Sequence, residues 1–241
     1  MSAHPMEQEL LSMGIQPDDI KLTQKLTRRA LENHLNLTHF IRTCERCALS
    51  MECYGQNPET PIVTTDRVIG TGPWNSPLMI VGDMPGEYEA KFHTPFVGLE
   101  GQLLSLILAK AGVDRNAVYM TYAVKCAATR EPTMQELKSC RYHMEKEIEA
   151  ISPHVILTIG EQAMKVVRDQ YNLVLEQEHG KLASITVADR TIKVIHTYSP
   201  LSMNKVPGRK ASIWNAVKLA VQTVRTERNH YSYDRVGLQN I

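Results

Sequence analysis

Two widely separated pairs of cysteines constrain this chain more than any other feature. Cys44 and Cys47 have C-x-x-C spacing, and Cys126 and Cys140 follow far downstream. Four thiolates can hold a tetrahedral zinc ion or an iron–sulfur cluster. The chain has five cysteines, an odd number, and a reducing compartment favours metal ligation over disulfides. The sequence therefore predicts one metal centre that joins the two pairs, with Cys53 left over.

Length and composition predict one large α/β domain with appended ends. The 241 residues, 43% of them hydrophobic, can bury a sizeable core. We expect a helical extension over 1–43, the domain over 44–226 and a tail over 227–241. The formal net charge is +1, so a nucleic-acid partner requires a local basic patch. No signal-peptide pattern and no long apolar stretch is present, so we expect a cytoplasmic monomer without a membrane partner.

Short apolar runs alternate with helical patterns from residue 78 onward. The predicted strands cover 78–83, 117–125, 154–160 and 191–200, and the predicted helices cover 100–112, 134–151, 161–171 and 210–226. This alternation predicts a three-layer α/β/α fold around a mostly parallel, four-stranded sheet. Ligands of such sheets bind at the carboxyl ends of the strands, where GDMPG, TYAVKC, TIGEQA and HTYSP fall.

Ordered motifs along this stretch resemble the family 4 uracil-DNA glycosylases, the iron–sulfur branch of that superfamily. The family pattern runs C-x-x-C, G-E-x-P-G, P-F-V-G, Y-x-T-N-x-V-K-C with a further cysteine, and T-Y-H-P-S. This chain has CERC, GDMPG, PFVG, YMTYAVKC with Cys140, and TYSPL. The resemblance covers residues 44–217. It implies the glycosylase fold, a DNA substrate and a pyrimidine nucleotide flipped out of the DNA.

For the cysteines, the resemblance implies a 4Fe-4S cluster held by Cys44, Cys47, Cys126 and Cys140. A closed four-cysteine zinc site remains the alternative, because spacing alone does not separate the two. With either occupant, we expect the metal to position the loop at 127–133 and to take no part in the chemistry.

The resemblance also assigns the base pocket to the GDMPG turn and the PFVG segment. Asp83 and Met84 are expected to line the pocket, and Phe96 to stack its flat ring on the base. Glu89 matches an acid that the family retains. Asp83 or Glu89 is expected to place the water that attacks the sugar.

Two positions depart from the family where base excision needs them. Tyr122 stands in place of the asparagine that reads uracil, and a phenol cannot reproduce the paired donor and acceptor of an amide. Ser199 stands in place of the motif's histidine, and loss of such a donor can slow excision by about 10²-fold. His93 replaces a glycine beside the pocket and is a candidate contact to the base. We expect His196, three positions before Ser199, to lie in the core.

The DNA contacts are expected in the GDMPG turn and after TYSP. The residues assigned to this role are Pro85, Gly86, Met203, Lys205, Arg209 and Lys210. Met203 or Leu201 can fill the gap that a flipped base leaves, as apolar wedges do in kinked DNA. The basic side chains suit phosphate contacts.

Three functions fit these motifs. The first is excision of uracil or a related base through hydrolysis of the N-glycosidic bond. The second is chemistry on a 5-substituted pyrimidine, such as transfer of an amino-acid co-substrate onto activated 5-hydroxymethyluracil in phage DNA, within the cytoplasm of a bacterial host. The third is DNA binding without catalysis. Tyr122 and Ser199 favour the second function, because a pocket that must not cleave the base has no use for the excision groups.

Overall fold

The computed structural model describes residues 16, 18, 21, 32, 35–52, 67–173 and 179–235, with their side chains except at 51–52 and 228–235. The chain forms two compact units, Met1–Phe40 and Ile41–Ile241. Cys53 and most of the predicted N-terminal helices lie outside the described residues, whereas positions 35–42 are helical. The sheet and all of the predicted site residues belong to the second unit.

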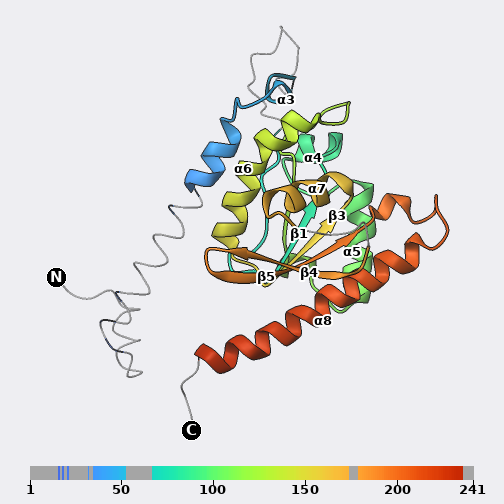
Figure 1. Cartoon of the computed structure of the whole chain (residues 1–241). Helices are drawn as coiled ribbons and strands as arrows, with labels where there is room; N and C mark the ends of the chain where they lie inside the picture. Colours follow the sequence, from blue (N-terminus) through green and yellow to red (C-terminus); the bar gives the residue numbers. More distant parts are fainter. Residues whose placement is uncertain are drawn as a thin grey trace. The chain divides into compact units, whose positions relative to one another are not determined.

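A five-stranded sheet forms the centre of the second unit (Figure 1). Its strands are β1 (Leu78–Gly82), β2 (Tyr119–Tyr122), β3 (Val155–Ile159), β4 (Leu182–Val187) and β5 (Arg190–Thr197). Their order is β2-β1-β3-β5-β4, and every neighbouring pair is parallel except β4 with β5. The predicted α/β/α fold with a mostly parallel sheet is confirmed, but the sheet has one strand more than the four predicted.

The additional strand is β4, which the sequence pattern hides. Only Ile185 of its six residues is buried, because β4 lies at the edge of the sheet and packs through one side chain. A two-residue turn joins it to β5, and the turn residues Ala188 and Asp189 have φ angles of 45° and 64°. Such left-handed turns usually carry glycine or asparagine, so Ala-Asp gives no hairpin signal.

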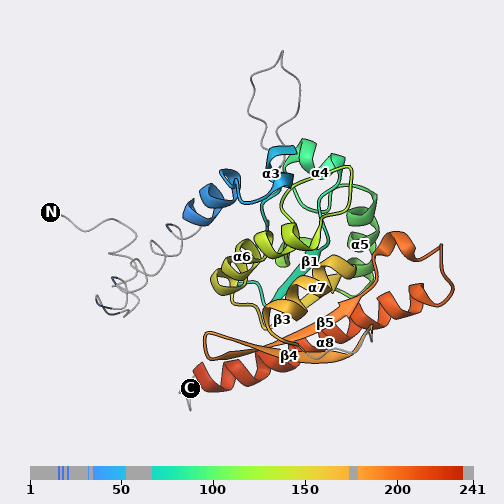
Figure 2. The same ribbon diagram turned by 45° about the horizontal axis from the view of Figure 1, so that its top comes forward.

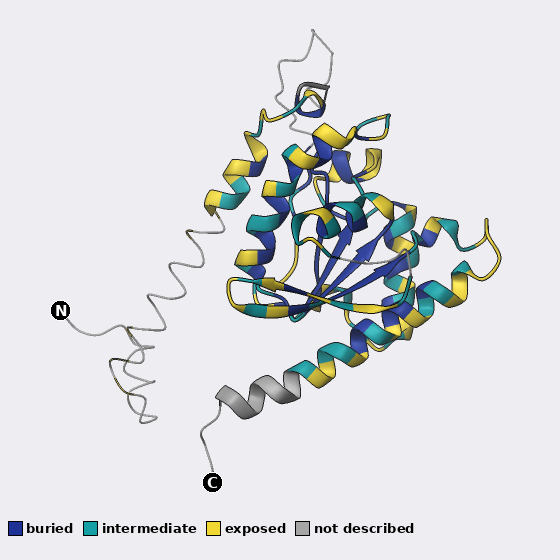
Figure 3. Ribbon diagram, viewed as in Figure 1, coloured by how far each residue is buried: buried dark blue, intermediate teal, exposed yellow. Residues whose placement is uncertain are grey.

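Helices cover both faces of the sheet (Figures 1 and 2). On one face lie α6 (Met134–Ile151) and α7 (Glu161–Gln170), and on the other lie α5 (Leu99–Lys110) and α8 (Arg209–Arg235). Successive residues of a strand point to opposite faces, so Met79 and Val81 join the α6 core while Leu78 and Ile80 join the α5 core. Strands β1, β2 and β3 are accordingly buried along their whole length, in contrast to the edge strand β4 (Figure 3).

Helix boundaries follow local signals. Thr133 begins α6 with a capping box, in which its backbone N–H donates to Glu136 Oε2 at 2.7 Å. Ser152, with φ of 51°, ends the same helix just before Pro153. Helix α8 continues to Arg235, so residues 227–235 are helical where a loose tail was expected. No helix among the described residues has both the length and the apolar character that a membrane span requires.

Short elements connect these layers and carry several of the predicted residues. They are α3 (Ala48–Glu52), α4 (Glu87–Phe92) and the 3-10 helices η1 (Arg115–Ala117) and η2 (Pro200–Ser202). The first follows the C-x-x-C pair, and α4 follows the GDMPG turn. Helix η2 follows β5, so it stands at the carboxyl edge of the sheet.

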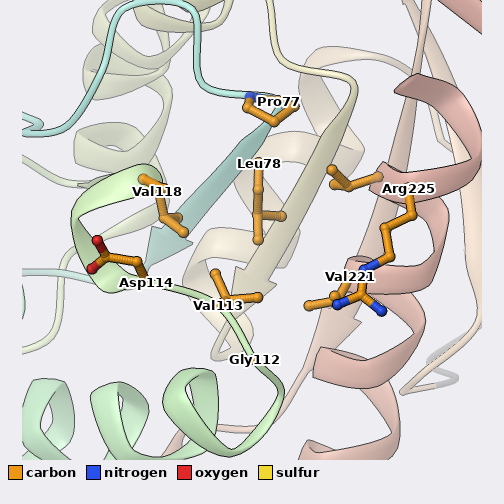
Figure 4. Close-up of a pocket in the computed structure, with 10 residues that line it drawn as sticks. Pro77, Leu78, Gly112, Val113, Asp114, Val118, Val221 and Arg225 are labelled. Atoms are coloured by element: carbon orange, nitrogen blue, oxygen red, sulfur yellow. The ribbon is translucent and has the colours of Figure 1, made fainter. Parts of the chain in front are cut away.

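An apolar cavity of about 230 Å³ lies at the opposite, amino-terminal edge of the sheet (Figure 4). Leu78, Val113, Val118 and Val221 line it, and the Arg225 side chain reaches across its α8 side. This cavity lies at the start of β1, whereas the predicted site residues follow the end of that strand.

Candidate active site at the carboxyl ends of the strands

A larger cavity of about 400 Å³ opens where β1, β3 and β5 end. The connection after β1 leads to α5 on one face, and the connection after β3 leads to α7 on the other. This divergence is the position at which parallel sheets bind ligands. The cavity is lined by Asp83, Met84, Glu131, Pro132, Gly160, Glu161, Gln162, Lys165, His179, Tyr198, Ser199, Ser202 and Arg209. Asp83, Met84, Ser199 and Arg209 were predicted as site residues, and the structure brings them together.

Asp83 joins the end of β1 to the start of α7. Its Oδ1 accepts the backbone N–H of Ala163 at 2.8 Å, in the first turn of that helix. A side chain at Gly160 would meet the Asp83 carboxyl group at 2.1 Å, so only glycine leaves it room there. Burial raises the pKa of Asp83 to about 6, although the backbone N–H groups of Ala163 and Gln162 oppose this rise. Asp83 can therefore exchange a proton near neutral pH.

Ser199 lines the same cavity and pairs with an acid that sequence reasoning missed. Its hydroxyl donates to Glu100 Oε1, in the first turn of α5, and accepts the backbone N–H of Leu201 at 3.2 Å. Desolvation raises the pKa of Glu100, and the nearby Asp83 and Glu89 charges add to the rise. Glu100 follows PFVG in the sequence, but no spacing signal connects it to Ser199, which lies 99 positions away.

Tyr122 and Phe96 contact each other and leave no space for a base between them. Their rings stack with centroids 4.7 Å apart, and the Phe96 backbone N–H donates to Tyr122 Oη at 3.1 Å. Both side chains are about 98–99% shielded from solvent, and a side chain at Gly82 would meet both rings at 2.8 Å. Neither ring lines the larger cavity. Tyr122 thus covers one face of the ring of Phe96, the residue that the resemblance assigned to stacking on the base.

Glu89 holds the loop between the GDMPG and PFVG segments. Its Oε1 accepts the Gly98 N–H at 2.7 Å, and its Oε2 accepts the Gly86 N–H at 3.1 Å. Arg115 fixes the same loop by donating to the Pro95 carbonyl at 2.8 Å. Because both carboxylate oxygens of the buried Glu89 bind the backbone, its geometry favours loop support over the placement of water, and Asp83 is the better candidate for that role.

A stack of rings and one cation forms another wall of the cavity. The His179 and Tyr198 rings lie 3.3 Å apart, and the Arg209 guanidinium lies 4.4 Å from the centre of the Tyr198 ring. His196 lies behind His179, is 2% exposed and contacts Thr158 Oγ1 at 3.0 Å, in keeping with a core position. Of this wall, only Arg209 was predicted from the sequence.

The remaining predicted contacts are not among the residues that line this cavity. His93 is exposed at the end of α4 with φ of 49°, while Lys205 and Lys210 are exposed and Met203 is partly buried around η2. Pro85 is buried and Gly86 is exposed in the turn before α4.

The four cysteines line one small cavity elsewhere in the unit, together with the cations Arg67 and Lys125. Burial raises the pKa of the Cys140 thiol to about 12 and also raises the pKa values of Cys44 and Cys47. A bound metal opposes this rise, because thiols ligate as thiolates. The donor set fits a four-thiolate centre, and the buried residues Arg67 and Lys125 line the same cavity.

Backbone and side-chain contacts hold the two cysteine segments beside each other. Arg67 donates to the carbonyl oxygens of Arg42 and Cys44, and His143 Nε2 lies 3.0 Å from Cys44 Sγ. The backbone N–H of Lys125 points at Cys140 Sγ, 3.4 Å away. Residues from at least three segments of the chain thus organise the cysteine cavity, which brings the two cysteine pairs together.

Comparison with known proteins agrees with this architecture. Residues 69–219 match the model of the uracil DNA glycosylase superfamily. The chain is 29% identical to a type-4 uracil-DNA glycosylase of Archaeoglobus fulgidus, over 72% of this chain and 84% of that protein. It is also 29% identical to type-4 uracil-DNA glycosylases of Saccharolobus solfataricus, over 66% of this chain and 72% of that protein, and of Thermotoga maritima, over 65% and 77%.

The fold, the strand-end cavity and the superfamily match together define an enzyme class that acts on DNA bases. This chain belongs to the uracil DNA glycosylase superfamily. The predicted family is confirmed, and so is the expectation of a DNA-processing enzyme.

Proposed function

We propose that this protein flips a nucleotide of DNA towards the strand-end cavity and hydrolyses the N-glycosidic bond of a base other than uracil. The relatives named as uracil-DNA glycosylases support excision as the reaction class over the amino-acid transfer that the sequence favoured. The stack of Tyr122 on Phe96 is the observation that argues against uracil as the excised base. No base can stack on the face of the Phe96 ring that Tyr122 covers, so the base cannot be held there as the resemblance implies for uracil.

In this proposal, Asp83 orients the attacking water. A carboxylate with a pKa of about 6 is largely ionised at neutral pH and still basic enough to take a proton. Ser199 lines the same cavity and would offer the departing base a polar contact. Placement of charge-stabilising groups in a water-poor cavity is the largest source of rate enhancement in many enzymes.

The test compares the protein with its Tyr122→Asn variant on duplexes that carry uracil, 5-hydroxymethyluracil or thymine opposite adenine. Release of free base is measured by mass spectrometry under single-turnover conditions. We expect the natural protein to leave uracil in place and to release a 5-substituted base. Tyr122→Asn should gain uracil excision, because removal of the ring uncovers Phe96.

Tyr122→Phe is the matched control, since it keeps the ring and loses only the hydrogen bond from the Phe96 N–H. We expect it to remain inactive on uracil. The proposal is wrong if the natural protein and Tyr122→Asn excise uracil at the same rate.

DNA contacts are proposed for the rim formed by η2 and the start of α8. Leu201 is 42% exposed and suits the apolar wedge, whereas Met203 is partly buried. Lys205 and Lys210 are exposed, and Arg209 faces the cavity over Tyr198. Each lysine that contacts a phosphate should lower the salt dependence of DNA binding by about one unit when it is replaced by alanine.

A 4Fe-4S cluster is proposed as the occupant of the cysteine cavity. The four thiols and the buried cations Arg67 and Lys125 support it. A bound cluster would hold the CERC segment to the segment that ends at Cys140 and keep the loop at 127–133 in place. Iron and sulfide analysis of anaerobically purified protein tests the assignment, with Cys140→Ser as the variant that should lose both; zinc without sulfide would overturn it.

Amino-acid transfer to a 5-substituted pyrimidine is the second candidate, and the charge pattern of the cavity supports it. Lys165 and Arg209 can meet a carboxylate, and Glu131 and Glu161 can meet an ammonium group. The same duplexes are therefore incubated with amino acids, with 5-hydroxymethyluracil also supplied in its pyrophosphorylated form. A gain in nucleoside mass with an intact glycosidic bond would favour transfer, and free base would favour excision.

A further inference from the structure

Ser199 has a hydroxyl group whose hydrogen bonds can be counted completely. A serine hydroxyl has one proton to donate and two lone pairs to accept with. One lone pair accepts the Leu201 N–H at 3.2 Å, and the proton goes to Glu100 Oε1. With Glu100 ionised, Ser199 can thus only accept a hydrogen bond from a ligand in the cavity.

A proton on Glu100 reverses this arrangement. The carboxylic acid then donates to Ser199 Oγ, which uses its second lone pair, and the serine proton is released to point into the cavity that Ser199 lines. The departing base of a glycosidic cleavage needs a donor, because negative charge develops on its carbonyl oxygens.

The surroundings of Glu100 favour the protonated form. Glu100 starts α5, and the titratable groups that face it are Asp83 after β1, Glu89 on α4 and the Tyr122 phenol on β2. Both acids repel a negative charge on Glu100, and desolvation opposes it further. The Ser199 hydroxyl is the one group that favours the ionised carboxylate among the causes that shift the Glu100 pKa.

We propose that Glu100 is a positioning residue that decides whether Ser199 donates or accepts a hydrogen bond in the cavity. This role rests on the proposed function, because the donor serves the departing base. Glu100 and Ser199 together replace the histidine that the family motif carries at position 199. Glu100 does not itself line the cavity and acts through Ser199.

The proton balance of the step closes within the cavity. As the C1′–N1 bond breaks, its electron pair goes to the base. Ser199 gives its proton to a carbonyl oxygen of the base and takes the proton of Glu100. Water adds its hydroxyl to C1′ and gives its proton to Asp83. One proton has then moved from Glu100 to Asp83, and the cavity keeps its charge.

The first test needs no DNA. Infrared difference spectra of the protein are recorded through an acid-to-alkaline titration, and the carboxylic-acid C=O band that disappears in Glu100→Gln is assigned to Glu100. We expect this band to persist above pH 4.5, the ordinary value for glutamate, and to change frequency and midpoint in Ser199→Ala. Glu149→Gln, which removes an exposed carboxylate on α6, should leave the band in place.

The second test is the pH dependence of single-turnover base release. The reaction needs an ionised Asp83 and a protonated Glu100, so ionisation of Asp83 should raise the rate and ionisation of Glu100 should lower it. In Glu100→Gln, the amide always donates to Ser199 but cannot resupply its proton. The falling limb should therefore disappear and the maximal rate should drop by about 10²-fold. Ser199→Ala should lose the same limb, and the double variant should be no slower than Ser199→Ala.

These measurements separate the two levels of inference. The proposal is overturned if the Glu100 C=O band vanishes near pH 4.5 or is unchanged in Ser199→Ala. It is also overturned if the decrease in rate at higher pH persists in Glu100→Gln. If no variant releases any base, the proposed function has failed, and the infrared titration alone decides whether Glu100 positions Ser199.

Discussion

Two shielded glutamates of this molecule, Glu147 on α6 and Glu100 on α5, have opposite surroundings. Glu147 is fully buried and pairs with Lys125, which is 1% exposed. It also accepts hydrogen bonds from the hydroxyls of Tyr119 at 3.2 Å and Thr121 at 3.0 Å. Glu100 has one hydroxyl partner and faces two other carboxyl groups. The negative charge of Glu147 is thus balanced by a cation and several hydrogen bonds, whereas that of Glu100 is not.

The difference separates framework from function. A buried charge that is paired and fully hydrogen-bonded keeps its charge and fixes the geometry around it. Lys125 also donates to the Tyr122 carbonyl at 2.7 Å, so this pair anchors the strand that leads into Cys126. An acid with incomplete compensation changes its protonation state within an accessible pH range, which is what proton transfer requires.

The largest loss of stability is expected when the buried ion pair between Glu147 and Lys125 is broken. Glu147→Gln leaves the Lys125 ammonium buried without a counter-charge, and loss of one partner of such a pair costs about 3–5 kcal/mol. The free energy of unfolding from urea titrations measures this loss.

Glu149→Gln is the matched control, because it removes a half-exposed carboxylate from an ion pair with Lys146 on the same helix. Surface pairs contribute about 0–1 kcal/mol. If both variants lose the same small amount, Glu147 is not the framework residue described above.

Replacement of Asp83 is expected to stabilise the protein, whereas replacement of Glu147 is expected to destabilise it. Its pKa is raised from 3.8 to about 6 in the folded protein, so its contribution to stability is complete below pH 3.8 and is lost as the pH rises through 6. Asp83→Asn cannot ionise and should be more stable than the natural protein by about 3 kcal/mol above pH 6. It should also lose base release.

Melting curves of both proteins between pH 3.5 and 8 measure this difference. The two curves should coincide near pH 3.5, separate between about pH 4 and 6, and run parallel above it. A constant offset over the whole range would mean that the ionisation of Asp83 is not the cause.

Much of the fold was predictable because its signals are local. Apolar runs marked β1 and β3, and the Thr133 to Glu136 capping box marks the start of α6. Strand β4 was not predictable, because five of its six residues remain partly or fully exposed and its turn lacks glycine. Helix α8 extends past its predicted end because its last residues, RNHYSYDR, carry no glycine or proline that would stop it.

The candidate site was predictable only where a motif supplied the residue. GDMPG and TYSP led to Asp83 and Ser199, and both line the cavity. Glu100 and His179 belong to no motif and reach the site through tertiary packing, which spacing along the chain does not reveal. The Tyr122 substitution was visible in the sequence, but its stacking on Phe96 depends on how the end of β2 and the loop before α5 meet in space.

The smallest effect is expected from Glu100→Gln on stability. The glutamine amide can keep the hydrogen bond to Ser199 Oγ and removes a carboxyl group that Asp83 and Glu89 repel. We expect the free energy of unfolding at pH 7 to change by less than about 1 kcal/mol, in contrast to Glu147→Gln. Urea titrations of the two variants side by side make the comparison. A loss of several kcal/mol for Glu100→Gln would place Glu100 with the framework, whereas near-equality with the natural protein, together with an altered pH profile, would keep the two glutamates in separate roles.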